Sequence, residues 1–192
     1  MSDRAQFELA QRLRGQGAPL GEVFSFISGL YFRGKLAYAR AFANGPQDVP
    51  GVFVITACAG LVSPDMHVTL KHLHELSAGC VDPEDRRFRH ALDRDSRAVS
   101  KAAGKDCQII LLGSIATPKY VGPLLEIFGE QLFFPAEFIG RGDLSRGGLM
   151  LRCVEEGVQL TYLPVMNALR RGPRPPKLAR KSAKETIQPA SD

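Results

Sequence analysis

Short runs of apolar and β-branched residues alternate with longer segments of helical spacing, and this alternation constrains the fold more than any other feature of the chain. The expected strands are residues 23–27, 51–57, 108–112, 132–134 and 159–163. The expected helices between them are residues 32–43, 68–76, 83–103, 118–128 and 144–156. Such alternation predicts an α/β fold of three layers, with a mostly parallel central sheet of about five strands and helices on both faces.

The chain of 192 residues is long enough for one domain, and its charge divides it into two parts. Residues 1–165 are expected to form a single α/β domain that opens with a helix over residues 3–14. Residues 166–192 hold seven of the 25 Lys and Arg residues but only two of the 20 Asp and Glu residues, so the domain is formally neutral. With four prolines as well, residues 166–192 are predicted to be a basic, disordered tail that attracts polyanions.

Several classes of protein are disfavoured by the composition. No apolar run reaches the roughly 20 residues needed to cross a bilayer, and the first residues are charged, so we expect a cytoplasmic protein without membrane contact. The cysteines are scattered without a CxxC pair, and we expect them to be reduced. Three histidines near Cys80 lack the spacing of zinc ligands, so we interpret them as surface residues and expect no metal or other cofactor.

Ligands of an open parallel sheet bind beyond the carboxyl ends of its strands, and four predicted strand ends carry small or polar residues. The first is Ser28-Gly29, which leads into Tyr31, Arg33 and Lys35. Glycine lets a ligand approach the backbone closely, and the basic side chains could hold an anion. The alternative is an ordinary turn with a solvated basic face.

The second strand end lies at Gly60, and the third begins a segment of small, cationic and aromatic residues: Gly113, Ser114, Thr117, Lys119 and Tyr120. Thr117 is the expected N-cap of the next helix, with Pro118 at its first position. A lysine in the first turn is unfavourable beside the positive end of the helix dipole unless an anion lies nearby. Function as an anion site and a simple N-cap are both open here.

The fourth strand end, residues 140–152 (GRGDLSRGGLMLR), is the most distinctive. Arg141 and Arg146 could clamp a phosphate, and the candidate ligand contacts of the loop are Arg141, Gly142, Ser145 and Arg146. Asp143 is the expected cap of the following helix and also the candidate general base. Two adjacent glycines inside that helix predict close packing or the close approach of a large group.

Three segments, in this order, resemble the peroxide-stress YaaA-type proteins and related small uncharacterised α/β domains. They are residues 55–65 (ITACAGLVSPD), residues 113–120 (GSIATPKY) and residues 141–146 (RGDLSR). The resemblance covers residues 51–152 discontinuously; Ala59 stands where the family tends to have Tyr, and the Lys-rich first segment of the family has no counterpart. It implies an α/β domain that binds nucleic acid and bears on oxidative DNA damage, with a distant similarity in layout to uracil-DNA-glycosylase-like folds.

The leading hypothesis is a nucleic-acid or nucleotide-binding domain, whose partner is DNA, RNA or a free nucleotide. Its basic side chains would contact phosphates and Tyr31 or Tyr120 would stack on a base. If the chain is an enzyme, N-glycosyl bond cleavage or transfer is expected, with Asp143 or Ser114 near the chemistry. The rivals are an enzyme acting on a small nucleoside or nucleotide, and a non-catalytic protein whose tail binds an acidic partner or RNA.

Overall fold

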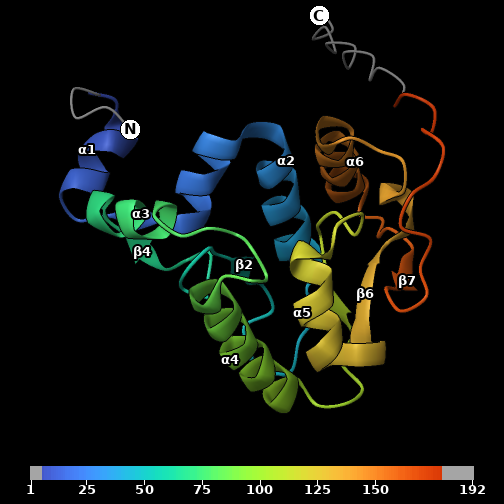
Figure 1. The fold of residues 1–192 in the computed structure, drawn as a ribbon. Coiled ribbons are helices and arrows are strands. Elements are labelled where there is room, and N and C mark those ends of the chain that lie inside the picture. Colours follow the sequence, from blue (N-terminus) through green and yellow to red (C-terminus); the bar gives the residue numbers. More distant parts are fainter. Residues whose placement is uncertain (1–5, 179–192) are drawn as a thin grey trace, which may run out of the picture.

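The computed structural model describes residues 6–178, and about half of the chain is helical (Figure 1). The α-helices of the described part are α1 (Glu8–Arg14), α2 (Leu20–Phe42), α3 (Leu70–Ser77), α4 (Arg86–Ala103), α5 (Pro118–Phe128) and α6 (Asp143–Glu156). The strands are β1 (Ala18–Pro19), β2 (Val54–Ile55), β3 (Leu61–Val62), β4 (His67–Val68), β5 (Ile109–Ile110), β6 (Leu132–Pro135) and β7 (Tyr162–Pro164). Two 3-10 turns, η1 (Gly129–Gln131) and η2 (Ala136–Phe138), flank β6.

The predicted five-stranded parallel sheet is wrong. About a tenth of the chain is strand, divided among two antiparallel pairs, β1–β4 and β2–β3, and one three-stranded sheet of order β5-β6-β7. In that sheet β5 and β6 are parallel, whereas β7 runs antiparallel to β6. One crossover of the expected kind remains, because α5 links two parallel strands with Ile109 opposite Leu132.

The largest error concerns residues 23–27, which form part of the first half of α2 and not a strand. The apolar residues of this run do not share one buried environment: Val23 is fully buried, whereas Phe26 and Ile27 are more than half exposed. A short apolar run cannot be assigned to a strand or a helix by periodicity alone. The predicted turn at Gly29 is a kink within α2, where the backbone has φ 64° and ψ −143°.

The C-terminal half of α2 packs along α6, side by side in Figure 1 although the helices are far apart in sequence. A methyl group added to Gly34 would lie 2.6 Å from the Gly147 carbonyl oxygen, and one added to Gly147 would lie 2.7 Å from the Leu30 carbonyl oxygen. The two backbones therefore touch directly. This packing confirms the close approach predicted for Gly147, while Gly148 would meet only the side chain of Leu178, at 3.6 Å.

Three apolar clusters form the interior. The first packs α4 and α5 on the three-stranded sheet around Phe88, Leu92 and Phe134. The second joins α1, the first half of α2 and the antiparallel pairs around Leu13 and Leu20. The third fills the space between α2, α6 and η2 with Tyr38, Phe138, Met150, Cys153 and Leu160.

The predicted tail, residues 166–192, lies partly outside the described residues. Its described part, residues 166–178, runs over the loop that precedes α6. A methyl group on Gly172 would lie 2.7 Å from the side chain of Ile139, and one on Gly140 would overlap the Pro173 carbonyl oxygen. The first basic residues of the tail are therefore held next to the segment that the sequence marks as distinctive.

Candidate functional site

The N-terminus of α6 lies between two different surroundings, the helix α2 on one face and residues 172–178 on the other. Gly142 is the N-cap residue, and the helix has no side-chain capping bond at this end. The prediction that Asp143 caps this helix is wrong, because Asp143 is the first residue of the helix. Its carboxylate instead pairs with Arg146 one turn further along, with 3.4 Å between Asp143 Oδ1 and Arg146 Nη1. The loop thus leaves backbone N–H groups of the first turn without a side-chain acceptor.

On the α2 face, the loop places Arg146 in a structural role. Arg146 is 9% exposed, and its Nε and Nη2 donate to the Phe138 carbonyl oxygen at 3.2 and 2.9 Å. Its guanidinium also lies above the Phe138 ring. These contacts close the turn η2 onto α6, so Arg146, one of the two arginines of the predicted phosphate clamp, is bonded to the fold itself.

Tyr31 and Lys35 of α2 complete this closed face. The Lys35 ammonium lies 3.9 Å from the centre of the Tyr31 ring, a cation–π contact. Burial lowers the pKa of Lys35, and the charge of Arg146 lowers it further against the opposing effect of Asp143. Burial raises the pKa of the Tyr31 hydroxyl, and the nearby Arg146 charge offsets part of that rise. The group is polar, and its three side chains are held by contacts with one another and with η2.

On the opposite face, a cavity of about 330 Å³ opens between α6 and the described part of the tail. We call it the α6 cavity; it is lined by Arg141, Gly142, Leu144, Ser145, Arg174, Pro175, Pro176, Lys177 and Leu178. Three of these residues are cationic and none is acidic. The predicted contacts Arg141, Gly142 and Ser145 therefore share one cavity with two cations that the sequence places in a predicted disordered tail.

Arg141 connects the two walls of the α6 cavity. Its Nη1 donates to Ser145 Oγ at 3.2 Å and to the Pro176 carbonyl oxygen at 3.4 Å. Its Nε is buried and has no hydrogen-bond partner among the described residues. A guanidinium beside uncapped backbone N–H groups is suited to an anionic oxygen.

The predicted site residues of α2 do not all join this region. Ser28, Gly29 and Arg33 are exposed, and a methyl group on Gly29 would meet nothing within 4 Å. They lie at the kink and on the outer surface of α2, and none lines the α6 cavity. Tyr31 and Lys35 reach only the closed face of α6.

The segment 113–120 forms the N-terminal end of α5. Thr117 is the N-cap residue and Pro118 the first residue of α5, as predicted, although the Thr117 side chain makes no capping bond. Ser114 Oγ instead accepts a bond from the Ala116 N–H at 3.3 Å. Tyr120 packs edge-on against Phe88 of α4, Lys119 is exposed, and Gly113 lies against Leu111. None of these residues lines the α6 cavity.

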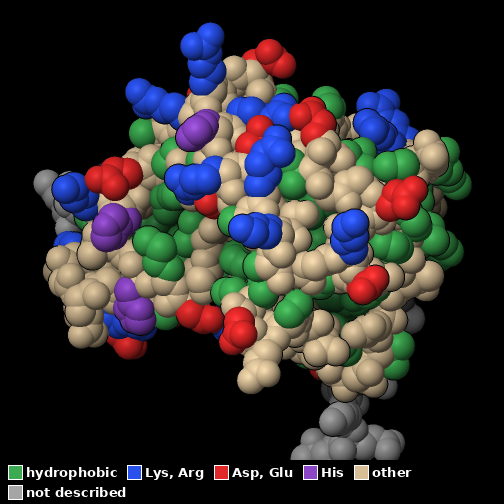
Figure 2. Space-filling model, turned by 90° about the horizontal axis from the view of Figure 1, so that it is seen from below, with side chains coloured by type: hydrophobic (Ala, Val, Ile, Leu, Met, Phe, Trp, Pro, Cys, Tyr) green, Lys and Arg blue, Asp and Glu red, His purple; other side chains and the backbone are tan. Residues whose placement is uncertain are grey.

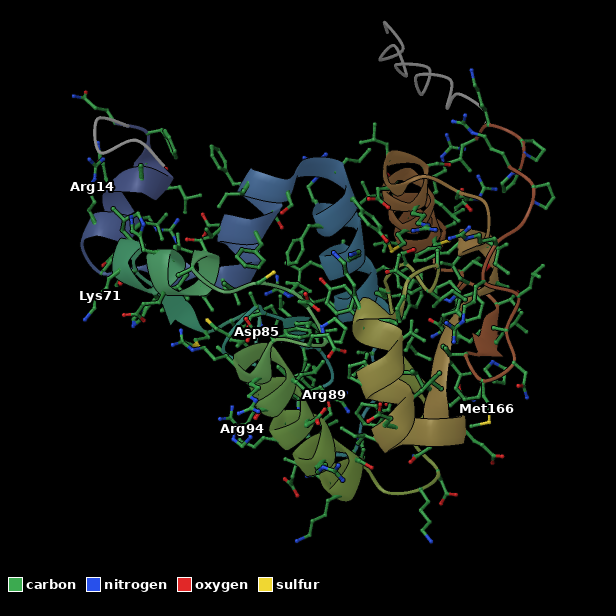
Figure 3. The ribbon with its side chains drawn as sticks, viewed as in Figure 1. Arg14, Lys71, Asp85, Arg89, Arg94 and Met166 are labelled. Atoms are coloured by element: carbon green, nitrogen blue, oxygen red, sulfur yellow. The ribbon has the colours of Figure 1, made fainter. Side chains whose placement is uncertain are left out.

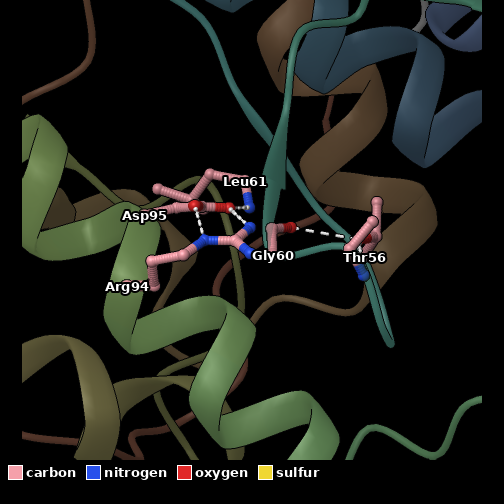
Figure 4. Close-up of polar contacts among 6 residues, drawn as sticks. Thr56, Gly60, Leu61, Arg94 and Asp95 are labelled. Atoms are coloured by element: carbon pink, nitrogen blue, oxygen red, sulfur yellow. Dashed lines mark hydrogen bonds and ion pairs between the residues drawn. The ribbon is translucent and has the colours of Figure 1, made fainter.

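Gly60 serves the β2–β3 hairpin, where it leaves no room for a ligand (Figure 4). A methyl group there would overlap Asp95 Oδ2 of α4. Thr56 is buried and donates to the Gly60 carbonyl oxygen, and the Leu61 N–H donates to Asp95. Burial opposes ionisation of Asp95, but hydrogen bonds from Arg94 and Leu61 outweigh it and lower the pKa of Asp95.

The described residues also bear on other kinds of site. His67, His72 and His74 are exposed, as predicted, and Cys80 is exposed as well. No three His, Cys, Asp or Glu side chains between residues 6 and 178 converge in a way that could hold a metal. The four cysteines have free thiols. None of the described helices combines the length and the apolar character that a membrane span requires.

Comparison with known proteins finds no relative. No family model matches the chain, no curated protein matches it, and no solved structure matches it. The resemblance to YaaA-type proteins stays a prediction, so the function has to follow from the geometry of the site.

Proposed function

We propose that this protein binds a phosphate-bearing ligand of nucleotide size in the α6 cavity. The observation that carries the proposal is the lining: Arg141, Arg174 and Lys177 border one cavity without a carboxylate to neutralise them. Its volume of about 330 Å³ lies in the range typical of small-molecule sites. Phosphate binding at residues 140–146 is thus retained from the sequence, but the proposed cations are Arg141, Arg174 and Lys177 in place of Arg141 and Arg146.

The phosphate is best received at the start of α6. Gly142 offers no side-chain oxygen to the first-turn N–H groups, and the helix dipole favours an anion there. Arg141 lines the same cavity and adds the charge of its guanidinium. Lys177 and Arg174 stand on the opposite wall, so charge converges on the ligand from two segments.

The same cavity offers an apolar surface for a base or sugar. Leu144 is 73% exposed, although it is a large apolar side chain, and Pro175, Pro176 and Leu178 line the same cavity. A bare phosphate ion would leave this surface in water, whereas a nucleotide would cover it. We therefore favour a mononucleotide, free or at the end of a strand, over inorganic phosphate.

The geometry supports binding and assigns no catalytic group. Asp143 and Ser114, the candidates for chemistry, do not line the α6 cavity. Tyr31 and Tyr120 do not line it either, so base stacking on them is replaced by packing against Leu144 and the two prolines. The proposal is a nucleotide-binding domain.

Calorimetric titration of the full chain tests the proposal with three probes: 5′-AMP, adenosine and inorganic phosphate. We expect 5′-AMP to bind more tightly than phosphate and adenosine to bind least. Arg141→Ala should weaken 5′-AMP binding about tenfold or more, because a charge-assisted hydrogen bond contributes about 1.5–3 kcal/mol. Arg33→Ala is the matched control, since Arg33 is an exposed arginine outside the cavity, and it should bind as the wild type does. Equal losses in both variants, or no binding of any nucleotide, would overturn the proposal.

A further inference from the structure

Helix α4 carries six Lys and Arg residues against two Asp residues, although the domain as a whole is formally neutral. The charge is segregated on the helix. The cationic and histidine side chains of its outer side follow a spacing of three and four residues: Arg86, His90, Arg94, Arg97 and Lys101. Residues at this spacing share one face of a helix, so these side chains form a single row. We call this row, together with the adjacent Arg87, the α4 stripe.

The opposite side of α4 explains why the stripe faces outward. Phe88 and Leu92 are fully buried against α5 and the three-stranded sheet, and Ser96 is buried as well. Asp95 turns to the β2–β3 hairpin, and Arg89 pairs with Asp93 and with Glu126 of α5. Every residue of the stripe is exposed, and Figure 3 shows Arg94 projecting outward from α4.

Most of the stripe is not neutralised by the fold. Among its Lys and Arg residues, Arg94 pairs with Asp95. The described residues provide no ion pair for Arg86, Arg87, Arg97 or Lys101. Figure 2, which views the molecule from below, shows Lys and Arg side chains across the middle of this face, with Asp and Glu side chains among and around them.

This arrangement costs stability in the isolated chain. Arg86 and Arg87 occupy the first turn of α4, where the helix dipole repels cations; the turn itself holds no acidic residue, although Asp85 caps it. Arg97 and Lys101 lie one turn apart and repel each other. Neither placement is needed by the buried face, which is made by other residues. An anionic partner would offset both repulsions, because its negative charge attracts all four cations.

We propose that the α4 stripe is a docking surface for the phosphate backbone of a nucleic-acid duplex, separate from the α6 cavity. From Arg86 to Lys101 the stripe extends about 22 Å at 1.5 Å per residue. A duplex carries a negative charge for about every 1.7 Å of its axis, counted over both strands, so a row of cations this long faces several phosphates. Arginine, which predominates in the stripe, bonds phosphate through two parallel N–H groups.

The stripe has the wrong composition for a membrane surface. A helix that lies on a bilayer inserts large apolar side chains beside its cations. The large apolar residues of α4, Phe88 and Leu92, are fully buried in the domain and cannot serve in that way. The binding expected is therefore electrostatic and independent of base sequence.

Fluorescence anisotropy with a labelled DNA duplex of about 20 base pairs, which exceeds the length of the stripe, tests this assignment with the full chain over a salt series. The variant Arg97→Gln/Lys101→Gln should bind at least tenfold more weakly at low salt. The slope of log K against log salt should fall in magnitude by about 1.8, which is about 0.9 for each phosphate that the protein no longer neutralises. Arg33→Gln/Lys71→Gln is the matched control: it removes two exposed cations from α2 and α3 and should leave both values nearly unchanged.

Two further variants and probes decide between explanations. Arg97→Lys/Lys101→Arg keeps the charge and should retain the wild-type slope, and circular dichroism should show all variants folded. Equal losses in both glutamine double variants would mean that only net charge matters, and unchanged binding in both would assign the duplex to the tail; each result overturns the proposal. Two other results would also overturn the proposal. The first is that the stripe variants lose more affinity for anionic phosphatidylserine vesicles than for the duplex, and the second is that the wild type does not bind the duplex.

Discussion

The two sides of the N-terminal end of α6 differ in how their arginines are held. Toward α2, Arg146 is buried, doubly bonded to the Phe138 carbonyl and paired with Asp143. Toward the tail, Arg141 bridges two walls of an open cavity and keeps one donor unused. Two arginines five residues apart therefore differ in role: Arg146 of α6 is part of the fold, whereas Arg141 of the preceding loop is the one that we propose to bind a ligand.

The largest effect is expected on the closed face, from Arg146→Ala. The change removes the donors of the Phe138 carbonyl and leaves a space between η2 and α6. We expect a loss of about 3 kcal/mol in the free energy of unfolding, because breaking a buried, charge-assisted interaction is costly. Urea unfolding followed by circular dichroism measures it. A loss below about 1 kcal/mol would show that Arg146 is not the structural arginine of the pair.

Gly147→Ala should cause the next largest loss in the free energy of unfolding, about 2 kcal/mol. A methyl group there meets the Leu30 backbone and forces α2 away from α6. The adjacent Gly148→Ala is an internal control, because its methyl group would make only an ordinary contact with Leu178. That control should be neutral or stabilising by up to about 1 kcal/mol through helix propensity. Thermal unfolding of both variants compares them, and similar behaviour of the two would contradict direct backbone contact.

On the open face, Arg141→Ala should change the free energy of unfolding by less than about 1 kcal/mol, because its partners remain accessible to water. Its effect should appear in ligand affinity instead. Urea unfolding of Arg141→Ala beside Arg146→Ala measures the two losses under the same conditions. If Arg141→Ala were as destabilising as Arg146→Ala, the two faces would not differ in role.

The smallest effect is a pH dependence carried by Lys35. Its pKa is lowered in the folded protein, so above that lowered value the unfolded chain binds more protons than the folded one. The wild type should therefore gain stability relative to Lys35→Met as the pH rises from the lowered pKa toward the unfolded value near 10.5. Unfolding of both proteins at several pH values between neutral and the unfolded pKa measures the difference. A constant difference would mean that burial does not disfavour the charged form of Lys35.

Sequence reasoning locates helices well where their signals are local. The expected helix over residues 118–128 is confirmed at both ends, and the one over residues 83–103 is confirmed at its end, where Gly104 follows α4. The predicted parallel sheet is wrong because an apolar run does not reveal which strand it will pair with. Val54 and Ile55 pair with a neighbouring hairpin strand, not with a distant parallel one.

The candidate site is predictable in part. Residues 140–146 carry a local signal, and Arg141, Gly142 and Ser145 do line the α6 cavity. Arg174 and Lys177 escape prediction because their position depends on Gly140 and Gly172, which let the tail cross the loop closely. The α4 stripe escapes it for a different reason: a formal charge of zero over the domain conceals the separation of charge within it.

The glycine contact between α2 and α6 also has a consequence for synthesis. Gly147 emerges from the ribosome more than a hundred residues after Gly34. At a translation rate of about 5–20 residues per second, the face of α2 that α6 will cover stays uncovered for on the order of ten seconds. During that interval Tyr38 and its neighbours are exposed in the nascent chain. A chaperone that protects apolar helix faces should therefore engage this protein between the completion of α2 and the release of α6.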